Sequence, residues 1–286
     1  MNLNYGALVG LDLPKQLQSY TDRDTMLFAL SAGIGDDPVD PRQLQFVYER
    51  QLVAMPAMAH ILAMASDWLF DPANGIDLKT LLHVESGLSM SGRLPPAGTV
   101  SSRLRITRVT DRGAGKGAVL AFERAIANEQ TNEAICTVSG TFLLRGNGGF
   151  GGPAEPRSVR PQIPQRLPDT NCTLPTSPRS ALLYRLNQDR NPIHVDPEVA
   201  ARAGFPRPIL HGACTYAVAM HALLAAVCDY ETDRVKTFNV RFSAPLFPGE
   251  TVRTDFWETE PGRYLFQSRC LDRDVVVLDD GLAEVR

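Results

Sequence analysis

The side chains best suited to proton transfer are gathered in one stretch of the second half of the chain. Asp189 and His194 stand five residues apart, with Asn191 and Pro192 between them. Pro192 disfavours helical backbone at Asn191, so this stretch is expected to be a turn or extended segment. A carboxylate and an imidazole can then converge on one small molecule and move protons to or from it near neutral pH.

A very apolar segment that begins at Gly212 follows this stretch. The run ACTYAVAMHALLAAVC predicts a buried central helix that is too short to span a bilayer. Its first turn presents free backbone N–H groups, and Gly212 has no side chain to keep a ligand away from them. The sequence therefore predicts an oxyanion site. Asp196-Pro197 and Gly204 predict the start and end of a shorter preceding helix, so Asp196 is expected to be structural.

The residues that carry these predictions resemble a known family. The run Asp189–His194, read as DRNPIH and followed by Leu210-His211-Gly212, is similar to the hydratase motif of MaoC-like dehydratases, in particular (R)-specific 2-enoyl-CoA hydratase 2. LHVE at 82–85, DRGAG at 111–115 and GNGGFGG at 146–152 resemble that subfamily's substrate domain. The resemblance implies reversible hydration of trans-2-enoyl-CoA to (3R)-3-hydroxyacyl-CoA, with an acyl-CoA substrate and no cofactor.

The resemblance also implies roles for individual residues. Asp189, Asn191 and His194 are expected to be catalytic: His194 activates a water, Asp189 orients the same water and passes a proton, and Asn191 holds the pair in place. The Gly212 N–H is expected to meet the thioester oxygen as negative charge grows on it. His211 is expected only to hydrogen-bond the turn before the helix. The expected substrate contacts are Gly212, His83, Val84, Arg112 and Phe242.

Three positions depart from the family's usual pattern. Val84 stands where glycine is usual and is expected to narrow the approach to the site. Arg112 stands where lysine is common, and it keeps a positive charge for a CoA phosphate. Gln188 replaces the glycine that usually precedes the catalytic Asp189, so it is strained if the backbone there has a positive φ.

An internal repeat indicates the elements that position these residues. In the second half, the buried helix is followed by four β-rich runs, VKTFNVRFSA, TVRTDFWETE, RYLFQSRCLD and DVVVLDDGLAEV. In the first half, the apolar run MPAMAHILAMA precedes SGLSMSGRL, VSSRLRITRV, GAVLAFERAI and EAICTVSGTFLL. The pattern predicts an α+β protein with two fused copies of a central helix wrapped by an antiparallel sheet, the double hotdog fold that the resemblance also implies.

We expect three parts along the chain. Residues 1–145 form a degenerate hotdog that binds the acyl chain and CoA, and residues 179–286 form the catalytic MaoC-like hotdog. Residues 146–178 hold a glycine cluster and then repeated prolines, which predict an extended linker with no packed element. The first copy has GDDPVDPRQLQF where the second has its Asp189–His194 run, so one active site per chain is expected.

Composition excludes several other classes of protein. With 286 residues, 44% hydrophobic and 21% charged, the chain reads as an ordinary globular protein. A net charge of −3 with no dense Lys/Arg stripe argues against nucleic acid as a partner. The 5 cysteines form no C-x-x-C pair, which argues against a disulfide framework or zinc site. No membrane segment and no leader or peroxisomal signal is recognised, so a cytoplasmic location is expected. The expectation that the protein forms a homodimer rests on the resemblance alone.

Alternatives to the hydratase remain open from the residues alone. A hotdog acyl-CoA thioesterase would cleave the same thioester, although the D-x-N-P-I-H order argues against it. A catalytically inactive acyl-CoA-binding protein is favoured if Gln188 and Val84 spoil the site. A metal site made of Asp189, His194, Asp196 and His211 is conceivable, but no H-x-x-x-H spacing supports it, and none is expected.

Overall fold

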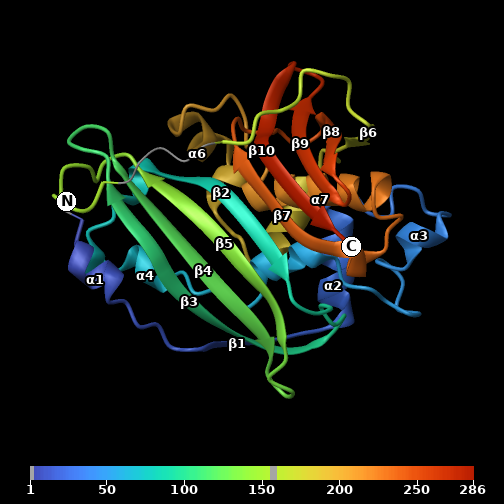
Figure 1. The fold of residues 1–286 in the computed structure, drawn as a ribbon, viewed down its shortest axis with the longest axis horizontal. Coiled ribbons are helices and arrows are strands. Elements are labelled where there is room, and N and C mark those ends of the chain that lie inside the picture. The colour runs from blue at the N-terminus through green and yellow to red at the C-terminus, as the bar shows by residue number, and fades with distance from the viewer. Residues whose placement is uncertain (1–2, 155–159) are drawn as a thin grey trace.

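The computed structural model describes residues 3–154 and 160–286, and its centre is one antiparallel sheet (Figure 1). The sheet has ten strands in the order β1-β3-β4-β5-β2-β7-β10-β9-β8-β6. The strands of the first half are β1 (Gln16–Tyr20), β2 (Leu81–Met90), β3 (Gly98–Asp111), β4 (Ala118–Asn128) and β5 (Ala134–Leu144). Those of the second half are β6 (Thr170–Pro175), β7 (Val235–Phe242), β8 (Thr251–Glu260), β9 (Arg263–Cys270) and β10 (Val275–Val285). This is the double hotdog that the sequence predicts.

The helices lie mainly on one face of this sheet and at its ends (Figure 1). The α-helices are α1 (Tyr5–Val9), α2 (Asp22–Ser31), α3 (Pro41–Leu44), α4 (Asp67–Phe70), α5 (Ser180–Tyr184), α6 (Pro197–Arg202) and α7 (Gly212–Ala226). The 3-10 helices are η1 (Pro56–Ile61), η2 (Pro72–Asn74), η3 (Leu78–Thr80), η4 (Arg185–Asn187), η5 (Pro192–His194) and η6 (Thr232–Arg234). No helix among residues 3–154 and 160–286 is long and apolar enough to cross a membrane.

The central helix of the second half is α7, as predicted from the apolar run. Ten consecutive residues from Thr215 to Leu224 are buried, which explains why the run carries no polar face. The ring of Tyr216 packs edge-on against that of Phe238 on β7, with centroids 5.1 Å apart. Packing on the inner face of the sheet thus fixes α7, and with it the position of Gly212 at its first turn.

The first half does not repeat this helix. The run MPAMAHILAMA was expected to form a helix equivalent to α7, but only the 3-10 helix η1 forms within it. The reason lies on β4, where the buried guanidinium of Arg124 donates hydrogen bonds to the carbonyls of Ala59, His60 and Leu62. Carbonyls held by a side chain no longer need the next helical turn, so the helix stops after six residues.

The linker also differs from its prediction. Residues 170–175 were expected to belong to an unpacked segment, but they form β6, which pairs with β8 at the edge of the sheet. The pairing reaches Pro175, whose missing N–H is tolerated because β6 is an edge strand. Residues 155–159 of the predicted linker lie outside the described part of the chain.

The two halves meet at their central strands and around matching elements. β2 pairs with β7 from Glu85–Arg241 to Ser89–Thr237. The strands β1 and β6 each pair with the corresponding strand, β3 and β8, and each is followed by a helix, α2 or α5. These helices touch through Phe28 and Tyr184, whose ring centroids are 5.9 Å apart, and Asn187 donates a hydrogen bond to Ser31 at 3.2 Å.

The same correspondence continues into the loops. Asp40-Pro41 caps α3 and Asp196-Pro197 caps α6, in each case with the aspartate side chain accepting a backbone N–H. Counting back from these two caps places Gly33 at the position of Asp189 and Pro38 at that of His194. The first copy thus has neither a carboxylate nor an imidazole at the two matching positions.

Candidate active site

The loop that holds Asp189 is shaped by backbone torsions that the local sequence partly predicts. Asn191 has φ −56° and ψ 123°, outside the helical region, as expected before Pro192. Gln188 has φ 79°, in the left-handed region that glycine tolerates better. A side chain in that region costs about 1 kcal/mol, so the surroundings of Asp189 must hold the turn in place.

His194 is the last residue of η5 and is buried beneath this loop. Its side chain is 9% exposed, and its Nδ1 lies 2.9 Å from the carbonyl oxygen of Ile209. Because a carbonyl oxygen can only accept, Nδ1 carries the proton and Nε2 keeps its lone pair in the neutral ring. Burial lowers the pKa of His194, which keeps the ring neutral at pH 7. The residue is thus in the form that a general base requires.

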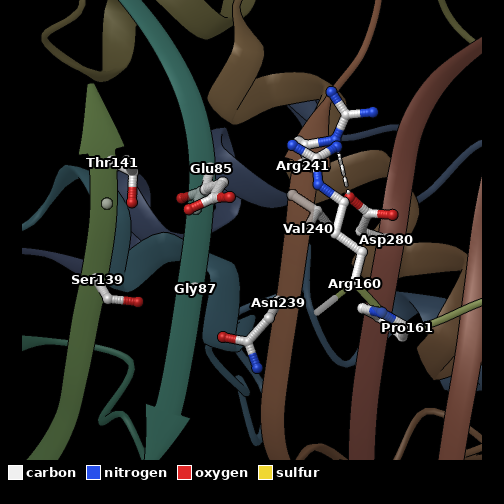
Figure 2. Close-up of a pocket in the computed structure, with 12 residues that line it drawn as sticks. Glu85, Gly87, Ser139, Thr141, Arg160, Pro161, Asn239, Val240, Arg241 and Asp280 are labelled. Carbon is white, nitrogen blue, oxygen red and sulfur yellow. Dashed lines mark hydrogen bonds and ion pairs between the residues drawn. The ribbon is translucent and has the colours of Figure 1, made fainter. Parts of the chain in front are cut away.

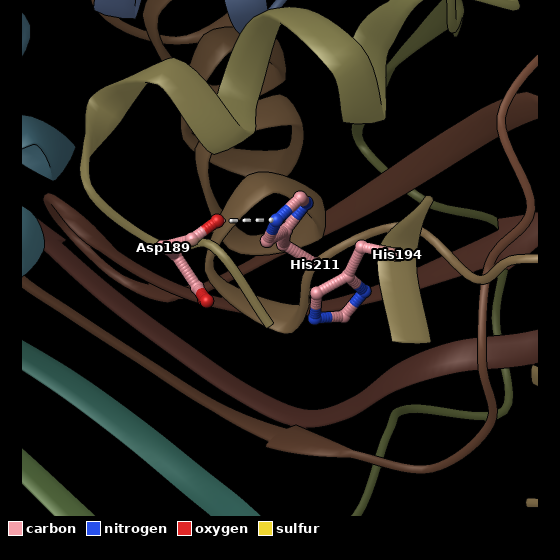
Figure 3. A group of neighbouring side chains, drawn as sticks. All are labelled: Asp189, His194 and His211. Carbon is pink, nitrogen blue, oxygen red and sulfur yellow. Dashed lines mark hydrogen bonds between the residues drawn. The ribbon is translucent and has the colours of Figure 1, made fainter. Parts of the chain in front are cut away.

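His211 lies against both predicted catalytic residues. Its ring stacks on that of His194 with centroids 3.7 Å apart and an interplanar angle of 28°, and its Nε2 lies 3.2 Å from the carbonyl oxygen of Asp189 (Figure 3). On its other side the ring meets that of Tyr184, with centroids 4.8 Å apart. Burial, and then the neighbouring His194, lower the pKa of His211 to about 4. The sequence placed this residue at the turn but missed these contacts; the His-Gly pair before an apolar helix was the available signal.

Asn191 is exposed and contributes to the shape of the loop. Its side chain caps η5 by accepting a hydrogen bond from the N–H of Ile193 at 3.2 Å. Its own N–H donates to Oδ1 of Asp189 at 3.3 Å. Asn191 thus orients the Asp189 carboxylate through the backbone, which is compatible with the expected role of holding the pair in place.

Gly212, Phe242 and His83 lie side by side on the inner face of the sheet. The ring of Phe242 is 3.5 Å from the point where a Cβ on Gly212 would lie. The rings of Phe242 and His83 are 5.3 Å apart, although one belongs to β7 and the other to β2. Gly140 on β5 leaves room for this arrangement, because a Cβ there would approach His83 Nε2 to 3.1 Å. These three predicted contacts therefore form one wall that leads from the N-terminus of α7 into the first half.

Val84 and Arg112 lie on the opposite, outer face of the sheet. Both line a groove with a volume of about 730 Å³. His83 packs on the inner wall, whereas Val84 and Glu85 both line the groove, because a β-bulge between His83 and Glu85 interrupts the alternation along β2. The charged side chains that line the groove are Arg108, Arg112, Lys116, Arg160 and Arg241, against Glu85 and Asp111. The groove is therefore positive in a chain whose net charge is −3.

The groove continues into a second pocket at the junction of the two halves. This pocket of about 230 Å³ shares Glu85, Thr141, Arg160 and Arg241 with the groove. Figure 2 shows Arg241 beside Asp280, to which it donates a hydrogen bond at 2.9 Å. Arg112 and Lys116 make no ion pair with any residue in 3–154 or 160–286. They are the groove's most available cations.

The hairpin that carries Arg112 is held by the glycine-rich segment at 146–152. The carboxylate of Asp111 accepts hydrogen bonds from the N–H groups of Gly113, Gly149 and Gly151, at 2.8, 2.7 and 2.7 Å. A Cβ on Gly148 would come within 2.2 Å of the Gly113 carbonyl oxygen, so only glycine fits there. Both glycine clusters are thus structural and place Arg112 at the end of the groove.

One group of side chains has the composition of a metal site. The nearest ligand atoms of Asp189, His194 and His211 all lie within 4.8 Å of one another. Asp196, the fourth residue considered, caps α6 instead. Imidazole lone pairs lie in the ring plane, so two rings stacked at 28° direct theirs nearly side by side and not toward one ion. The geometry favours proton transfer over metal binding.

Comparison with known proteins identifies the family. The model of the MaoC like domain matches residues 160–280, and that of the MFE-2 hydratase 2 N-terminal domain matches residues 18–146. The 3-hydroxyacyl-thioester dehydratase Y of Mycobacterium tuberculosis is 37% identical over 96% of this chain and 96% of its own length. The peroxisomal enoyl-CoA hydratase 2 of Arabidopsis thaliana is 36% identical over 99% and 96%.

A solved structure agrees with these matches. The MaoC-like dehydratase from Phytophthora capsici superposes with a TM-score of 0.87 at 32% identity, covering 99% of both chains. With both halves matched by family models and the double hotdog in place, the chain belongs to the MaoC-like dehydratases of the enoyl-CoA hydratase 2 type, which are hydro-lyases.

Proposed function

We propose that the protein reversibly hydrates trans-2-enoyl-CoA to (3R)-3-hydroxyacyl-CoA, using Asp189 and His194 at one site per chain. The observation that carries the proposal is the state of His194: its Nδ1 is occupied by the Ile209 carbonyl, and its Nε2 is left to act as a base beside Asp189. Groups no more than 4.8 Å apart can both hydrogen-bond one water of ordinary size.

The chemistry follows from this arrangement. Nε2 of His194 takes a proton from the water as its oxygen bonds to C3 of the enoyl group. The electron pair of the double bond moves through C2 to the thioester oxygen, where the Gly212 N–H and the helix dipole stabilise the charge. The protonated His194 passes this proton to the Asp189 carboxylate, which delivers it to C2, so both groups return to their starting states. The reverse sequence removes water from the 3-hydroxyacyl thioester.

The rest of the substrate fits the two faces of the sheet. β2 and β7 pair only as far as Glu85 and Arg241, so beyond this point their backbones are not joined. His83, Val84 and Phe242 border that region, where the pantetheine arm is proposed to pass from the outer groove to the inner wall. The CoA phosphates then lie near Arg112, and the acyl tail extends along His83 toward Phe142, in the apolar part of the first half.

A single site per chain is supported by the correspondence between the halves. Gly33 and Pro38 occupy the positions that match Asp189 and His194, and neither has a side chain that can transfer a proton. In place of α7 the first half has the six-residue 3-10 helix η1, whose first residue, Pro56, has no N–H to donate. The first copy is therefore proposed to serve only in substrate binding.

One assay tests the proposal and separates it from its alternatives. Enoyl absorbance and free thiol are followed together on crotonyl-CoA and a longer homologue, and the product is coupled to dehydrogenases specific for the R or S alcohol. Loss of the enoyl signal without thiol, and oxidation only by the R-specific enzyme, is the expected result. Thiol release would indicate a thioesterase, and no change would indicate a binding protein.

A further inference from the structure

His211 has contacts that a simple packing role does not require. It is the residue before α7, its side chain is 0% exposed, and its carbonyl accepts hydrogen bonds from the N–H and hydroxyl of Thr215. Its Nδ1 has no hydrogen-bond partner among residues 3–154 and 160–286. A buried nitrogen without a partner destabilises a fold, so a phenylalanine would fill this space at lower cost if packing were the only function.

The other ring nitrogen makes the contact that a phenylalanine could not make. Nε2–H donates to the carbonyl oxygen of Asp189 at 3.2 Å, and this carbonyl follows directly on Gln188, whose φ is 79°. The donor therefore holds the one backbone turn in the site that is strained. With its pKa lowered to about 4 by burial, the ring is neutral at pH 7 and carries a single N–H.

The face of the same ring holds the second catalytic group. His194 stacks on it at 3.7 Å, and Tyr184 backs it from the other side at 4.8 Å. Side chains clamped between buried rings lose the freedom to rotate away from their hydrogen bonds. His211 thus touches Asp189 through its edge and His194 through its face (Figure 3).

We infer that His211 is a positioning residue that sets the relative placement of the two catalytic groups, with its Nε2–H fixing the Asp189 backbone and its ring fixing His194. This inference rests on the proposed function of Asp189 and His194. Displacement of a reacting group by about 1 Å lowers turnover by about 10²-fold, so loss of either contact should be visible in kcat.

Two substitutions separate the two contacts. His211→Phe keeps a stacking ring and removes the donor, whereas His211→Gln keeps an N–H donor and removes the ring. His221→Phe is the matched control, because His221 is 1% exposed, lies on α7, the helix that His211 precedes, and also contacts a backbone carbonyl, that of Ala32 at 3.4 Å. It lies ten residues along α7 from His211, about 15 Å away.

We expect both His211 variants to lose about 10²-fold in kcat while KM changes by less than about threefold. In His211→Gln the pH at which kcat falls on the acidic side should rise toward 6.5, the ordinary pKa of histidine, because His194 loses the neighbour that keeps water from it. In His211→Phe the acidic limb of this pH profile should stay at its wild-type pH. His221→Phe should lower the melting temperature and leave both kcat and the acidic limb of its pH profile unchanged. Turnover in both His211 variants within twofold of wild type, or the same kcat loss in His221→Phe, would overturn the inference.

A second readout does not depend on activity. The ring nitrogens of His194, observed by 15N NMR, should show Nδ1 protonated in the wild-type protein and a mixture of tautomers in His211→Gln. If wild type hydrates enoyl-CoA but the tautomer and kcat are unaffected by the substitutions, the positioning role is wrong. If wild type does not hydrate enoyl-CoA, the proposed function is wrong, and an unchanged tautomer in His211→Gln would still reject the positioning role.

Discussion

Substituting Gly212 by alanine should make the protein more stable and less active. Gly212 begins α7 with a negative φ, so alanine can adopt its backbone without strain. The new Cβ would lie 3.5 Å from the nearest atom of Phe242, which is ordinary van der Waals contact. Replacing glycine at a compatible position stabilises a protein by about 0.4–1 kcal/mol, because the unfolded chain loses freedom. We therefore expect a small rise in the free energy of unfolding.

Activity should move the other way because of where the methyl group lies. A thioester oxygen that accepts from the Gly212 N–H must approach to about 2.7–3.1 Å, in the space between this backbone and the Phe242 ring. The Cβ would occupy that space. Losing one oxyanion donor costs about 2.7–4 kcal/mol in the transition state, or about 10²–10³-fold in kcat. The KM for crotonyl-CoA should change less, since the donor acts mainly on the developing charge.

The assay combines urea unfolding with steady-state kinetics on the same preparations. Ala213→Gly is a useful companion, because it loosens the next position of the helix and should lower stability while leaving the proposed donor free. Full activity in Gly212→Ala, together with unchanged or higher stability, would show that the thioester oxygen does not bind at this N–H. A clear loss of stability would show that the space estimated beside Phe242 is absent.

Further predictions concern other parts of the site. Asp189→Asn should lower kcat by about 10²-fold or more with little change in melting temperature, and near-normal turnover would place the chemistry elsewhere. His194→Ala should lose as much activity, but because the ring is buried and stacked it should also cost about 1–3 kcal/mol, which chemical denaturation would measure. Arg112→Ala should raise KM for an acyl-CoA and leave an acyl-pantetheine unaffected, whereas Arg103→Ala, on the strand β3 that leads to Arg112, should affect neither; equal effects on both substrates would exclude a phosphate contact. Burial lowers the pKa of His221 to about 4 from the ordinary 6.5, so the unfolded chain takes up a proton there first, and the contribution of His221 to stability should fall by about 1.4 kcal/mol per pH unit between these values as pH drops. His221→Phe should reduce the overall slope by that amount in urea melts, and an unchanged slope would contradict a buried neutral ring.

The parts of the fold that the sequence predicted correctly depend on interactions between near neighbours. The Asp196-Pro197 cap, the start of α7 at Gly212 and the extended Asn191 before Pro192 all follow from torsion preferences and hydrogen bonds that span a few residues. The second-half strands were recognisable for the same reason, since alternation and turn residues are local signals. The family motif is local as well, so membership could be inferred from it.

Contacts between distant segments were decided only by the tertiary structure. The end of η1 depends on Arg124 from a strand more than sixty residues later, and β6 forms only because β8 offers it an edge. Likewise, the stack of His211 on His194 needs two loops to meet, so a residue that looked merely structural in the sequence lies against both proposed catalytic groups.

The division of the proposed substrate site between the two faces of the sheet has the same origin. His83 and Val84 are adjacent in sequence, yet one joins Phe242 on the inner wall and the other joins Arg112 in the outer groove. A β-bulge between His83 and Glu85 interrupts the alternation of side chains there, and which face is inner depends on how β2 pairs with β7 from the other half. The sequence by itself determined which residue types are present and how each short segment folds, and the pairing of the strands into one ten-stranded sheet determined which of them meet.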